Sequence, residues 1–435
     1  MIDIKLLRED PEKVKKGIAV KKSDPKLVDE FLARDGEWRE LVQKMEELRA
    51  EQKKISGKRD VEAGKKNKEL IKEVEAKITE VEKAREIAHL KIPNLPSDDT
   101  PIGASEKDNR VLRKVGEPRK FSSGGVSASG GDFDPKDHLA LGEALGIINT
   151  ESAGKISGTR FAYLMGDAVK LEFALVNYTL ETLTNPETIK MIADSVRSGY
   201  SANPFIPVVP PTMIKPAVFE RMARLEPRDE RYHLAQDDLY LIGSAEHTLG
   251  PLHMDEAIPE EKLPIRYVGF STNFRREAGS YGKDTKGILR LHQFDKLELE
   301  SFCLPENSVV EQNFFVATQE HLMKSLGIPY QVVSICTGDM GGPDARQIDI
   351  EAWMPGQGTY RETHTADLMT DYQSRRLGTK VKRKDGKTEF VHMNDATAFA
   401  IGRTIIAIME NYQTKDGKIE VPKVLQKYVG KEVIG

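Results

Sequence analysis

The sequence predicts an α+β protein in which an antiparallel β-sheet flanked by helices follows an N-terminal antiparallel helical arm. Roughly the first 110 residues are rich in Lys, Glu, Leu and Arg and poorer in Gly than the rest of the chain, and their apolar residues recur as in a coiled coil. From about residue 137, apolar strands follow one another across tight turns, without the regular strand–helix alternation of a parallel sheet. The 435 residues are enough for two or three domains, and we expect one at 1–110 and another at 111–435.

The arm is expected to span about residues 27–90. Two apolar runs repeat every three or four residues, the first at Phe31, Trp38, Leu41, Met45, Leu48 and Ile55, the second at Ile71, Val74, Ile78, Val81 and Ala88. Between them, Gly57 and Gly64 are expected to break the helix. Each helix of about 30 residues would be about 45 Å long. A two-helix hairpin buries a single seam, so the arm should project from the body.

The tip of this arm is basic. Its cations are Lys53, Lys54, Lys58, Arg59, Lys65, Lys66 and Lys68, with Asp60 and Glu62 as the acidic residues among them. A charge run of this kind is usually a solvated helix end, and on its own that interpretation is favoured. The alternative is a contact with the phosphate backbone of a nucleic acid.

Bulk composition excludes several classes of protein. The net charge is −4, so any contact with nucleic acid must come from a local basic patch. The two cysteines, Cys303 and Cys336, have no paired Cys/His spacing, which disfavours a disulfide scaffold or a structural zinc site and fits a reducing compartment. No apolar run could cross a membrane, and the first residues lack the apolar core of a secretory signal. We therefore expect a cytoplasmic protein without a membrane partner.

The rest of the chain alternates loops with predicted strands and helices. Three prolines in 92–103 end the arm, and FSSGGVSASGGDFD is a flexible loop by composition. The predicted strands cover 264–274, 289–302, 330–335 and 348–355, and the predicted helices cover 167–183, 311–326 and 397–411.

One stretch, FRREAGSYGKDTKGILRLHQFDKLELESF, carries an unusual polar face. Its leucines at 289, 291, 297 and 299 share one parity, as in a half-buried strand. If the preceding segment is also a strand, the opposite face collects Arg275, Glu277, Arg290, His292, Phe294 and Glu298, with 279–287 as a long hairpin loop. A strand facing water is the alternative. An aromatic ring between arginines favours a nucleotide site, because Arg binds phosphate and a ring with a second guanidinium can sandwich a base.

Three further positions stand out. Arg403 lies in a nearly apolar helix and must meet an anion there, either a core carboxylate or a ligand phosphate, with Gly402 allowing close approach. Glu362, at the expected end of a second strand after 348–355, could bind Mg²⁺ or simply be solvated. Ser244 and Glu246 follow an apolar strand, where an ordinary helix cap is the alternative. No Gly-rich phosphate loop, dinucleotide fingerprint or nucleophile elbow is present.

Taken together, these segments resemble the class II aminoacyl-tRNA synthetases. FRREAG…RLHQFDKLELESF resembles their motif 2, AIGRTIIAIMENY their motif 3, and NPFIPVVPPTMI, with Pro211, the motif 1 that builds the dimer interface. The N-terminal arm, PKDHLALGEALGII, SGTRFAYL, WMPGQGTYRE, DYQSRRL and DGKIEVPKVLQKY narrow the resemblance to the seryl-tRNA synthetases over almost the whole chain.

The resemblance implies a homodimer with a class II catalytic sheet and an arm that grips the long variable arm of serine tRNA. It therefore favours tRNA contact for the basic tip. It also implies ATP and Mg²⁺ as cofactors and two steps: the carboxylate of L-serine attacks the α-phosphorus of ATP, releasing pyrophosphate, and the seryl group then moves to the terminal adenosine of the tRNA.

Residue roles follow from the same resemblance. The implied catalytic residues are Arg275 for the α-phosphate and serine carboxylate, Glu277 for the adenine amino group or the tRNA end, and Arg403 for the γ-phosphate and one face of the adenine. Phe294 would stack on the other face, Arg290 would reach the phosphates, and Glu362 would bind Mg²⁺. The remaining ATP-site residues would be Arg276, Leu291, Thr363, His364 and Thr365. The serine site would comprise Ser244, Ala245, Glu246, Arg275, Glu298 and Thr397.

Several positions depart from the family pattern. Ser244 replaces a threonine, Asp395 replaces an asparagine, and the 363–368 segment differs throughout. His364 is either a metal ligand or a packed side chain, and packing is favoured. Residues 122–131 and part of 184–203 look inserted.

Two rival functions remain on the same fold. A paralogue that activates an amino acid for a carrier protein would lack the arm. A non-catalytic tRNA-binding scaffold would be expected to lose Arg275, Arg403 or Glu362, and all three are present.

Overall fold

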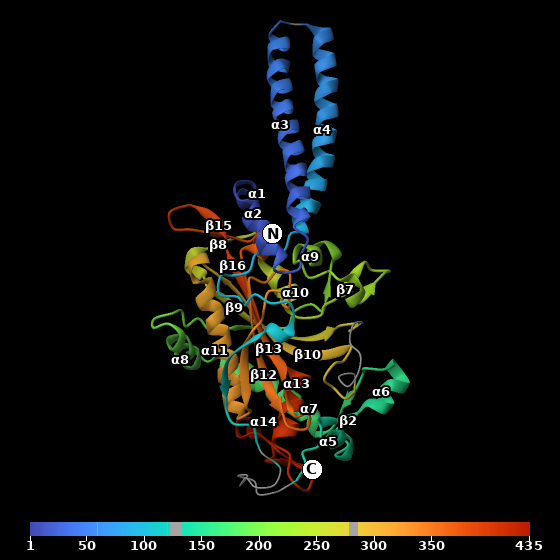
Figure 1. Ribbon diagram of the computed structural model, residues 1–435, viewed down its shortest axis with the longest axis vertical. Coiled ribbons are helices and arrows are strands. Elements are labelled where there is room, and N and C mark those ends of the chain that lie inside the picture. Colours follow the sequence, from blue (N-terminus) through green and yellow to red (C-terminus); the bar gives the residue numbers. More distant parts are fainter. Residues whose placement is uncertain (59, 120, 122–132, 278–285) are drawn as a thin grey trace.

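The computed structural model describes residues 1–58, 60–119, 121, 133–277 and 286–435. In this part of the chain, two long helices project from a body that is built around one eight-stranded sheet (Figure 1). This is the α+β architecture that the sequence predicts, with the arm in its expected place.

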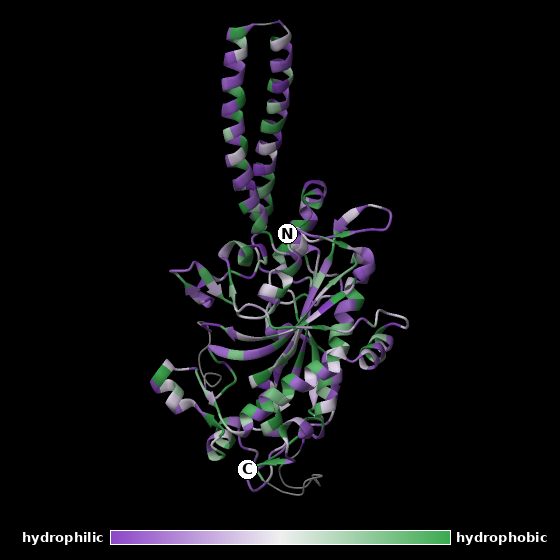
Figure 2. Ribbon diagram, turned by 180° about the vertical axis from the view of Figure 1, so that it is seen from behind, coloured by the Kyte–Doolittle hydropathy of each residue, from purple (hydrophilic) through white to green (hydrophobic). Residues whose placement is uncertain are grey.

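The arm consists of α3 (Lys26–Lys58) and α4 (Val61–Leu90), which pack against each other along the predicted seam. Met45, Val74 and Val81 are buried between them, and Figure 2 shows hydrophobic positions at intervals along otherwise hydrophilic helices. The helices separate between the two expected breakers: Gly57 is the next-to-last residue of α3, whereas the expected break at Gly64 is wrong, because Gly64 lies inside α4. A helical glycine costs only about 1 kcal/mol relative to alanine, which packing along the seam can offset.

The base of the arm is fixed by one buried carboxylate. Asp35, in α3, accepts hydrogen bonds from Arg8 of α1 (Ile4–Glu9) at 2.8 Å, from Arg85 of α4 at 2.7 Å and from Arg39 at 3.2 Å. Three elements therefore meet at a single anion. A buried charge held by several cations is costly to disturb, so this junction sets where the arm leaves the body. A short helix, α2 (Pro11–Ala19), lies between α1 and α3.

The main sheet has the strand order β1-β11-β12-β13-β16-β10-β9-β4, with every neighbouring pair antiparallel except β9 and β4. Its strands are β1 (Arg110–Val115), β4 (Ile206–Val208), β9 (Ile265–Phe274), β10 (Gln293–Cys303), β11 (Tyr330–Ser334), β12 (Arg346–Met354), β13 (Thr359–Thr370) and β16 (His392–Ala400). The predicted strands at 264–274, 330–335 and 348–355 correspond to β9, β11 and β12, and the helices predicted at 167–183 and 311–326 to α7 (Asp167–Thr184) and α11 (Ser308–Leu326).

The polar stretch that the sequence singled out is less regular than expected. The strand predicted from Leu289 begins only at Gln293, and the residues before it form turns and bends. Strand β9 ends at Phe274, so Arg275 and Glu277 do not share a strand face, and Glu277 has a φ of 50°. The chain leaves β9 after Phe274, so side chains no longer alternate between two faces as they do in a strand. That alternation therefore could not predict where the side chains of Arg275 and Glu277 point. The 279–287 loop lies mostly outside the described residues.

Two other boundaries differ from expectation. The helix predicted at 397–411 is α13 (Ile401–Asn411), and Thr397 belongs to β16 instead. Its apolar run continues from strand into helix, and a run of this kind does not distinguish a buried strand from a buried helix. Glu362 does not end its strand, because β13 continues to Thr370. Part of the segment that looked inserted forms α8 (Pro186–Val196).

The two faces of the sheet have opposite character. One face buries Leu297, Leu299, Ala366 and Ala396 in a core that also includes apolar residues of α7, α11 and α13. Alternate residues of the same strands point the other way, and these are polar: Glu298, Asp367, Asp395 and Thr397 line a pocket. Period-two alternation in three central strands therefore creates a charged surface directly opposite the core.

A helix side chain also ties these strands together. Gln319 of α11 donates to the backbone oxygens of Thr365 and Thr397, at 2.8 and 2.9 Å. It thus links β13 and β16 beneath the pocket. No helix within the described residues is both long and apolar enough to cross a bilayer.

Candidate active site

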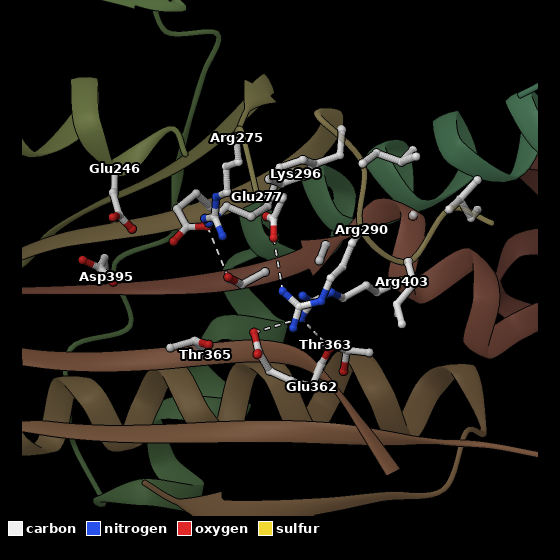
Figure 3. Close-up of a pocket in the computed structure, with 18 of the residues that line it drawn as sticks. Glu246, Arg275, Glu277, Arg290, Lys296, Glu362, Thr363, Thr365, Asp395 and Arg403 are labelled. Atoms are coloured by element: carbon white, nitrogen blue, oxygen red, sulfur yellow. Dashed lines mark hydrogen bonds and ion pairs between the residues drawn. The ribbon is translucent and has the colours of Figure 1, made fainter. Parts of the chain in front are cut away.

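The pocket on the polar face collects side chains from segments that are far apart in the sequence (Figure 3). Strands β10, β13 and β16 form its floor, and the segments after β9 and before β10, with the start of α13, form its sides. Its lining residues are Arg224, Glu246, Arg275, Glu277, Ile288, Leu289, Arg290, Leu291, Phe294, Lys296, Glu298, Glu362, Thr363, Thr365, Asp367, Asp395, Thr397, Ala400, Gly402 and Arg403. Most of the predicted site residues are therefore brought together.

One end of the pocket is rich in arginine. Arg403 contacts Glu362 with 3.0 Å between Nη1 and Oε1, and it also donates to the backbone oxygen of Glu362 at 2.9 Å. Arg290 pairs with Glu277 at 3.2 Å. Arg403 is not fully buried as its helix suggested, since its side chain is 21% exposed and faces the pocket. The sequence left open a core carboxylate or a ligand as its anion; here it contacts a pocket carboxylate.

The arginines control the ionisation of Glu362. Desolvation by the surrounding pocket would raise the pKa of this carboxyl group, whose side chain is 49% exposed, but Arg403, Arg275 and Arg290 outweigh that effect and hold the pKa below its usual value. Glu362 is therefore an anion at neutral pH. Three guanidiniums acting on one carboxylate leave positive charge in excess at this end, which suits a polyanion such as a triphosphate.

A β-bulge explains how Glu362 reaches the pocket. Ile350 of β12 pairs with His364, and Glu351 pairs with Glu362, so Thr363 is an extra residue in β13. The parity of the strand changes at this point. Thr365 and Asp367 line the pocket on one parity, and Glu362 lines it on the other, an arrangement that alternation alone could not predict.

Phe294 lies beside the arginines. The Arg275 guanidinium carbon is 5.3 Å from the centroid of the Phe294 ring, within cation–π range. Close by, a β-carbon on Gly402 would approach the backbone oxygen of Ile288 to 3.3 Å. Glycine at position 402 thus lets the backbone at Ile288 come close to the start of α13, as expected of a glycine that allows close approach.

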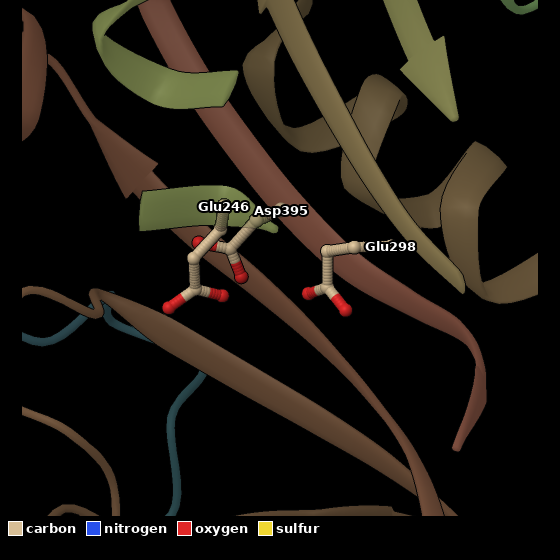
Figure 4. Close-up of side chains that lie close together, drawn as sticks. All are labelled: Glu246, Glu298 and Asp395. Carbon is tan, nitrogen blue, oxygen red and sulfur yellow. The ribbon is translucent and has the colours of Figure 1, made fainter. Parts of the chain in front are cut away.

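The opposite end of the pocket is acidic. Glu246, Glu298 and Asp395 each direct one carboxylate oxygen to a common region, and these oxygens lie within 4.8 Å of one another (Figure 4). Lys296 contacts Glu298 at 2.5 Å, and Thr397 donates to Glu298 at 3.4 Å. Figure 3 shows Glu246 and Asp395 at one side of the pocket and Arg403 at the other.

Crowding of buried carboxylates changes their proton affinities. Burial, together with Glu246, raises the pKa of Glu298 to about 7, although Lys296 opposes the rise. Burial and Glu246 also raise the pKa of Asp395 well above its usual range. For Glu246, burial is outweighed by Arg224 and His247, and the pKa is held well below normal. A cationic ligand would relieve this repulsion.

The predicted Ser244–Glu246 segment is a strand-to-helix turn, as expected. It follows β7 (Leu239–Leu241) and leads into α10 (Glu246–Leu249). Glu246 lines the pocket, whereas Ser244 is buried and lies 3.4 Å from Glu246, and Ala245 packs in an apolar cluster. Ser244 therefore orients Glu246 and does not itself line the pocket.

Three further polar residues predicted at the site are placed elsewhere. Arg276 is exposed, donates to the backbone oxygen of Arg231 and lies over Tyr232. His292 lies next to Arg275, whose backbone oxygen is 2.9 Å from Nδ1, outside the pocket lining. His364 is buried against Phe399, as a packed side chain would be, and burial lowers its pKa to about 3.

Three charged residues of the pocket, Arg224, Asp367 and Lys296, were given no role by the sequence. Arg224 comes from the loop after α9 (Pro216–Arg221), in a segment without any recognisable motif. Asp367 lies in the divergent stretch after Glu362. Lys296 lies in β10, between Phe294 and Glu298. The alternation of β13 could have indicated Asp367, whereas nothing local marks Arg224.

The donor atoms of the pocket fit magnesium only in part. Mg²⁺ in nucleotide sites is typically held by one or two carboxylates together with substrate phosphates. Glu362 supplies one ionised carboxylate among the arginines that would hold phosphates. The donor set is therefore compatible with an ion that shares its ligands with ATP.

Comparison with known proteins covers both parts of the chain. Residues 1–96 match the seryl-tRNA synthetase N-terminal domain, and residues 230–412 match the tRNA synthetase class II core domain (G, H, P, S and T). The serine–tRNA ligase of Acidothermus cellulolyticus is 40% identical, with 100% of this chain and 99% of the relative covered. That of Pseudothermotoga lettingae is 38% identical, with full coverage of both.

Solved structures agree with the sequence relatives. The seryl-tRNA synthetase from Pyrococcus horikoshii complexed with ATP matches with a TM-score of 0.90 and 37% identity, covering 100% of this chain and 99% of the other. The cytoplasmic serine–tRNA ligase from Naegleria fowleri in complex with AMP matches with a TM-score of 0.87, at 32% identity and over 100% and 98% of the two chains. With this fold, this pocket and full-length relatives, the chain belongs to the seryl-tRNA synthetases, a family of class II aminoacyl-tRNA synthetases.

Proposed function

We propose that this chain is a serine–tRNA ligase that works in two steps. It activates L-serine with ATP to seryl-adenylate, releasing pyrophosphate, and then transfers the seryl group to the 3′-terminal adenosine of serine tRNA. One observation supports this most strongly: a single pocket has an arginine end and a carboxylate end, so it can hold a polyanion and an ammonium group together.

The acidic end fits the ammonium group of an amino acid. A primary ammonium has three N–H donors, and oxygens of Glu246, Glu298 and Asp395 converge on one region. Thr397, which contacts Glu298, would read the serine hydroxyl together with that carboxylate. A site that hydrogen-bonds a hydroxyl rejects analogues that lack it, because its own polar groups are then left unpaired.

The arginine end fits the phosphates of ATP. Arg275 would hold the α-phosphate and the serine carboxylate, Arg290 the outer phosphates, and Arg403 the γ-phosphate. Phe294 would stack on the adenine, with Glu277 near its amino group. Glu362 would hold a Mg²⁺ ion, which offsets phosphate charge when bound.

These side chains would catalyse activation without a general base. The serine carboxylate is already ionised and attacks the α-phosphorus directly, so no proton has to leave the nucleophile. Arg275 orients the carboxylate and the phosphate toward each other, and the guanidiniums neutralise charge that develops on the phosphate oxygens.

The arm would deliver the tRNA. The tip lysines Lys53, Lys54, Lys58, Lys65, Lys66 and Lys68 are all exposed, and Arg59 lies outside the described residues. We propose that they contact the phosphate backbone of the long variable arm of serine tRNA. In this view residues 1–110 form the tRNA-binding domain and residues 111–435 the catalytic domain.

A homodimer is part of the proposal. Strand β4, from the motif 1 segment, is the last strand of the main sheet, and Ile206, Val209 and Met213 around it are 50%, 82% and 47% exposed. An uncovered strand edge with apolar side chains favours a second copy as its partner. For the protein's location we propose the cytoplasm, in line with the two free, buried cysteines.

Amino-acid-dependent ATP–pyrophosphate exchange, followed by charging of total tRNA, tests the function. Serine should stimulate exchange, and alanine should not. Serine tRNA should then accept the amino acid. Absence of serine-dependent exchange would contradict the proposal, and exchange without charging would favour the carrier-protein alternative.

A further inference from the structure

We propose that Arg224 is a positioning residue for the amino-acid substrate, holding two of the three converging carboxylates in the places where they receive its ammonium group. This inference rests on the proposed function and assigns a role to a residue outside the family motifs. Arg224 lines the acidic end of the pocket, and its side chain is 15% exposed.

Two cations, Arg224 and Lys296, contact the three converging carboxylates. The Nε atom of Arg224 lies 3.1 Å from Glu246, and its Nη2 lies 3.2 Å from Asp395. The third carboxylate, Glu298, contacts Lys296 instead. Each substrate-facing carboxylate therefore has one oxygen near a protein cation, and the three together still present oxygens within 4.8 Å of one another.

Arg224 also neutralises the charge behind the pocket. Asp344 lies 3.4 Å from Nη2 and Asp367 lies 3.7 Å from the same atom, so four carboxylates surround one guanidinium. Without that guanidinium, the buried anions would repel one another and take up protons. A protonated Glu246 binds ammonium weakly, because it has lost its charge.

The arginine is itself held in place. Its backbone oxygen accepts hydrogen bonds from Nε and Nη2 of Arg231, at 3.1 and 2.8 Å. Arg224 belongs to an irregular loop, and these hydrogen bonds hold its backbone in place. Such a fixed cation can impose geometry on Glu246 and Asp395, which come from α10 and β16.

Arg224→Met and Arg224→Lys test the proposal in serine-dependent ATP–pyrophosphate exchange. In Arg224→Met the KM for serine should rise by about 30-fold or more, because removing one partner of a buried charge pair leaves the others uncompensated. The KM for ATP should change by less than about threefold, since the arginine end is intact. Arg224→Lys keeps the charge and should recover part of the affinity for serine.

A second substitution separates positioning from general support of the fold. Adding Asp344→Asn to Arg224→Met removes one of the repelling charges behind the pocket, at a residue that does not line it, and should lower the KM for serine again. Arg221→Met is the matched control, because Arg221 pairs with Asp255 outside the pocket; it should lower thermal stability and leave the KM for serine unchanged.

The possible results separate the two proposals. An unchanged KM for serine in Arg224→Met overturns the inference, and so does a loss of kcat and stability with both KM values unchanged. If Asp344→Asn raises the KM of Arg224→Met for serine further, charge balance is not the role of Arg224. A wild-type protein without serine-dependent exchange defeats the proposed function and this inference with it, whereas an active wild type with an unaffected Arg224→Met defeats the inference alone.

Discussion

The arm tip and the pocket are both rich in charged side chains, and they differ in burial. The six described lysines at the tip are exposed to solvent. In the pocket, Lys296 and Glu298 are 6% and 2% exposed and contact each other, and Arg224 lies among four carboxylates. Exposed charges interact weakly and are screened by salt, whereas buried charges interact strongly and shift one another's pKa values.

This contrast shows how one protein can use charge in two ways. At the tip, cations suit a long, flexible polyanion whose position need not be fixed within an ångström. In the pocket, opposite charges at two ends fix the orientation of a small substrate. Substitutions in the pocket should therefore have large effects that depend little on salt, and substitutions at the tip should have small effects that depend on it strongly.

Arg403→Ala should give the largest effect. Removing a guanidinium aimed at transferring phosphates should lower ATP–pyrophosphate exchange by about 10³-fold. Exchange at saturating ATP and serine measures this, and size-exclusion chromatography should show the same oligomeric state as wild type. Activity within tenfold of wild type would mean that Arg403 only pairs with Glu362.

The pH dependence of serine use tests the buried carboxylates. Glu298 has a pKa of about 7, raised by burial and by Glu246. Above that pH it is an anion and attracts the ammonium group, and below it the group is protonated and neutral. We therefore expect kcat/KM for serine to fall by up to about tenfold per pH unit below pH 7.

Glu298→Gln provides the control for that profile. The amide cannot titrate, so the KM for serine should be high at every pH and the step near pH 7 should disappear. A variant that keeps the wild-type profile would assign the step to another group, such as Asp395, whose pKa is raised in the same direction.

The arm tip should show the smallest effect for each residue. The triple variant Lys58→Ala, Lys65→Ala, Lys66→Ala should raise the KM for tRNA by about tenfold and reduce the dependence of log KM on log salt concentration by about two to three, as expected for three lost phosphate contacts. Charging assays at several KCl concentrations measure both quantities. ATP–pyrophosphate exchange should stay at the wild-type level, and a fall in exchange would contradict the separation of arm and pocket.

Sequence patterns predicted much of the fold because they reflect local periodicity. The arm seam, with Met45, Val74 and Val81, follows the repeat of a coiled coil, and α7, α11, β9, β11 and β12 lie where apolar periodicity placed them. Boundaries failed at Gln293, where turns precede the strand, and at Ile401, where one apolar run continues from strand into helix.

The candidate site was predicted less evenly. Arg275, Phe294, Glu298, Glu362 and Arg403 line one pocket as the sequence suggested. Arg276 and His292 do not line it, because the loops around them direct their side chains elsewhere. His364 does not line it because it shares the parity of Ala366, which faces the core. Arg224 could not be found locally, since its partners lie on β13, β16 and α10 and in the loop at Asp344.

By itself, then, the sequence determined the helical arm, the antiparallel sheet and the residue types of a nucleotide and amino-acid site. Each of these depends on the spacing of residues that are close together in the sequence. Only the tertiary structure decided which charges face each other. Ion pairs and pKa shifts depend on distance and burial, and both arise when strands and loops that are distant in sequence are brought to one face of the sheet. The pairing of Arg224 with Glu246 and Asp395 exists only at that level.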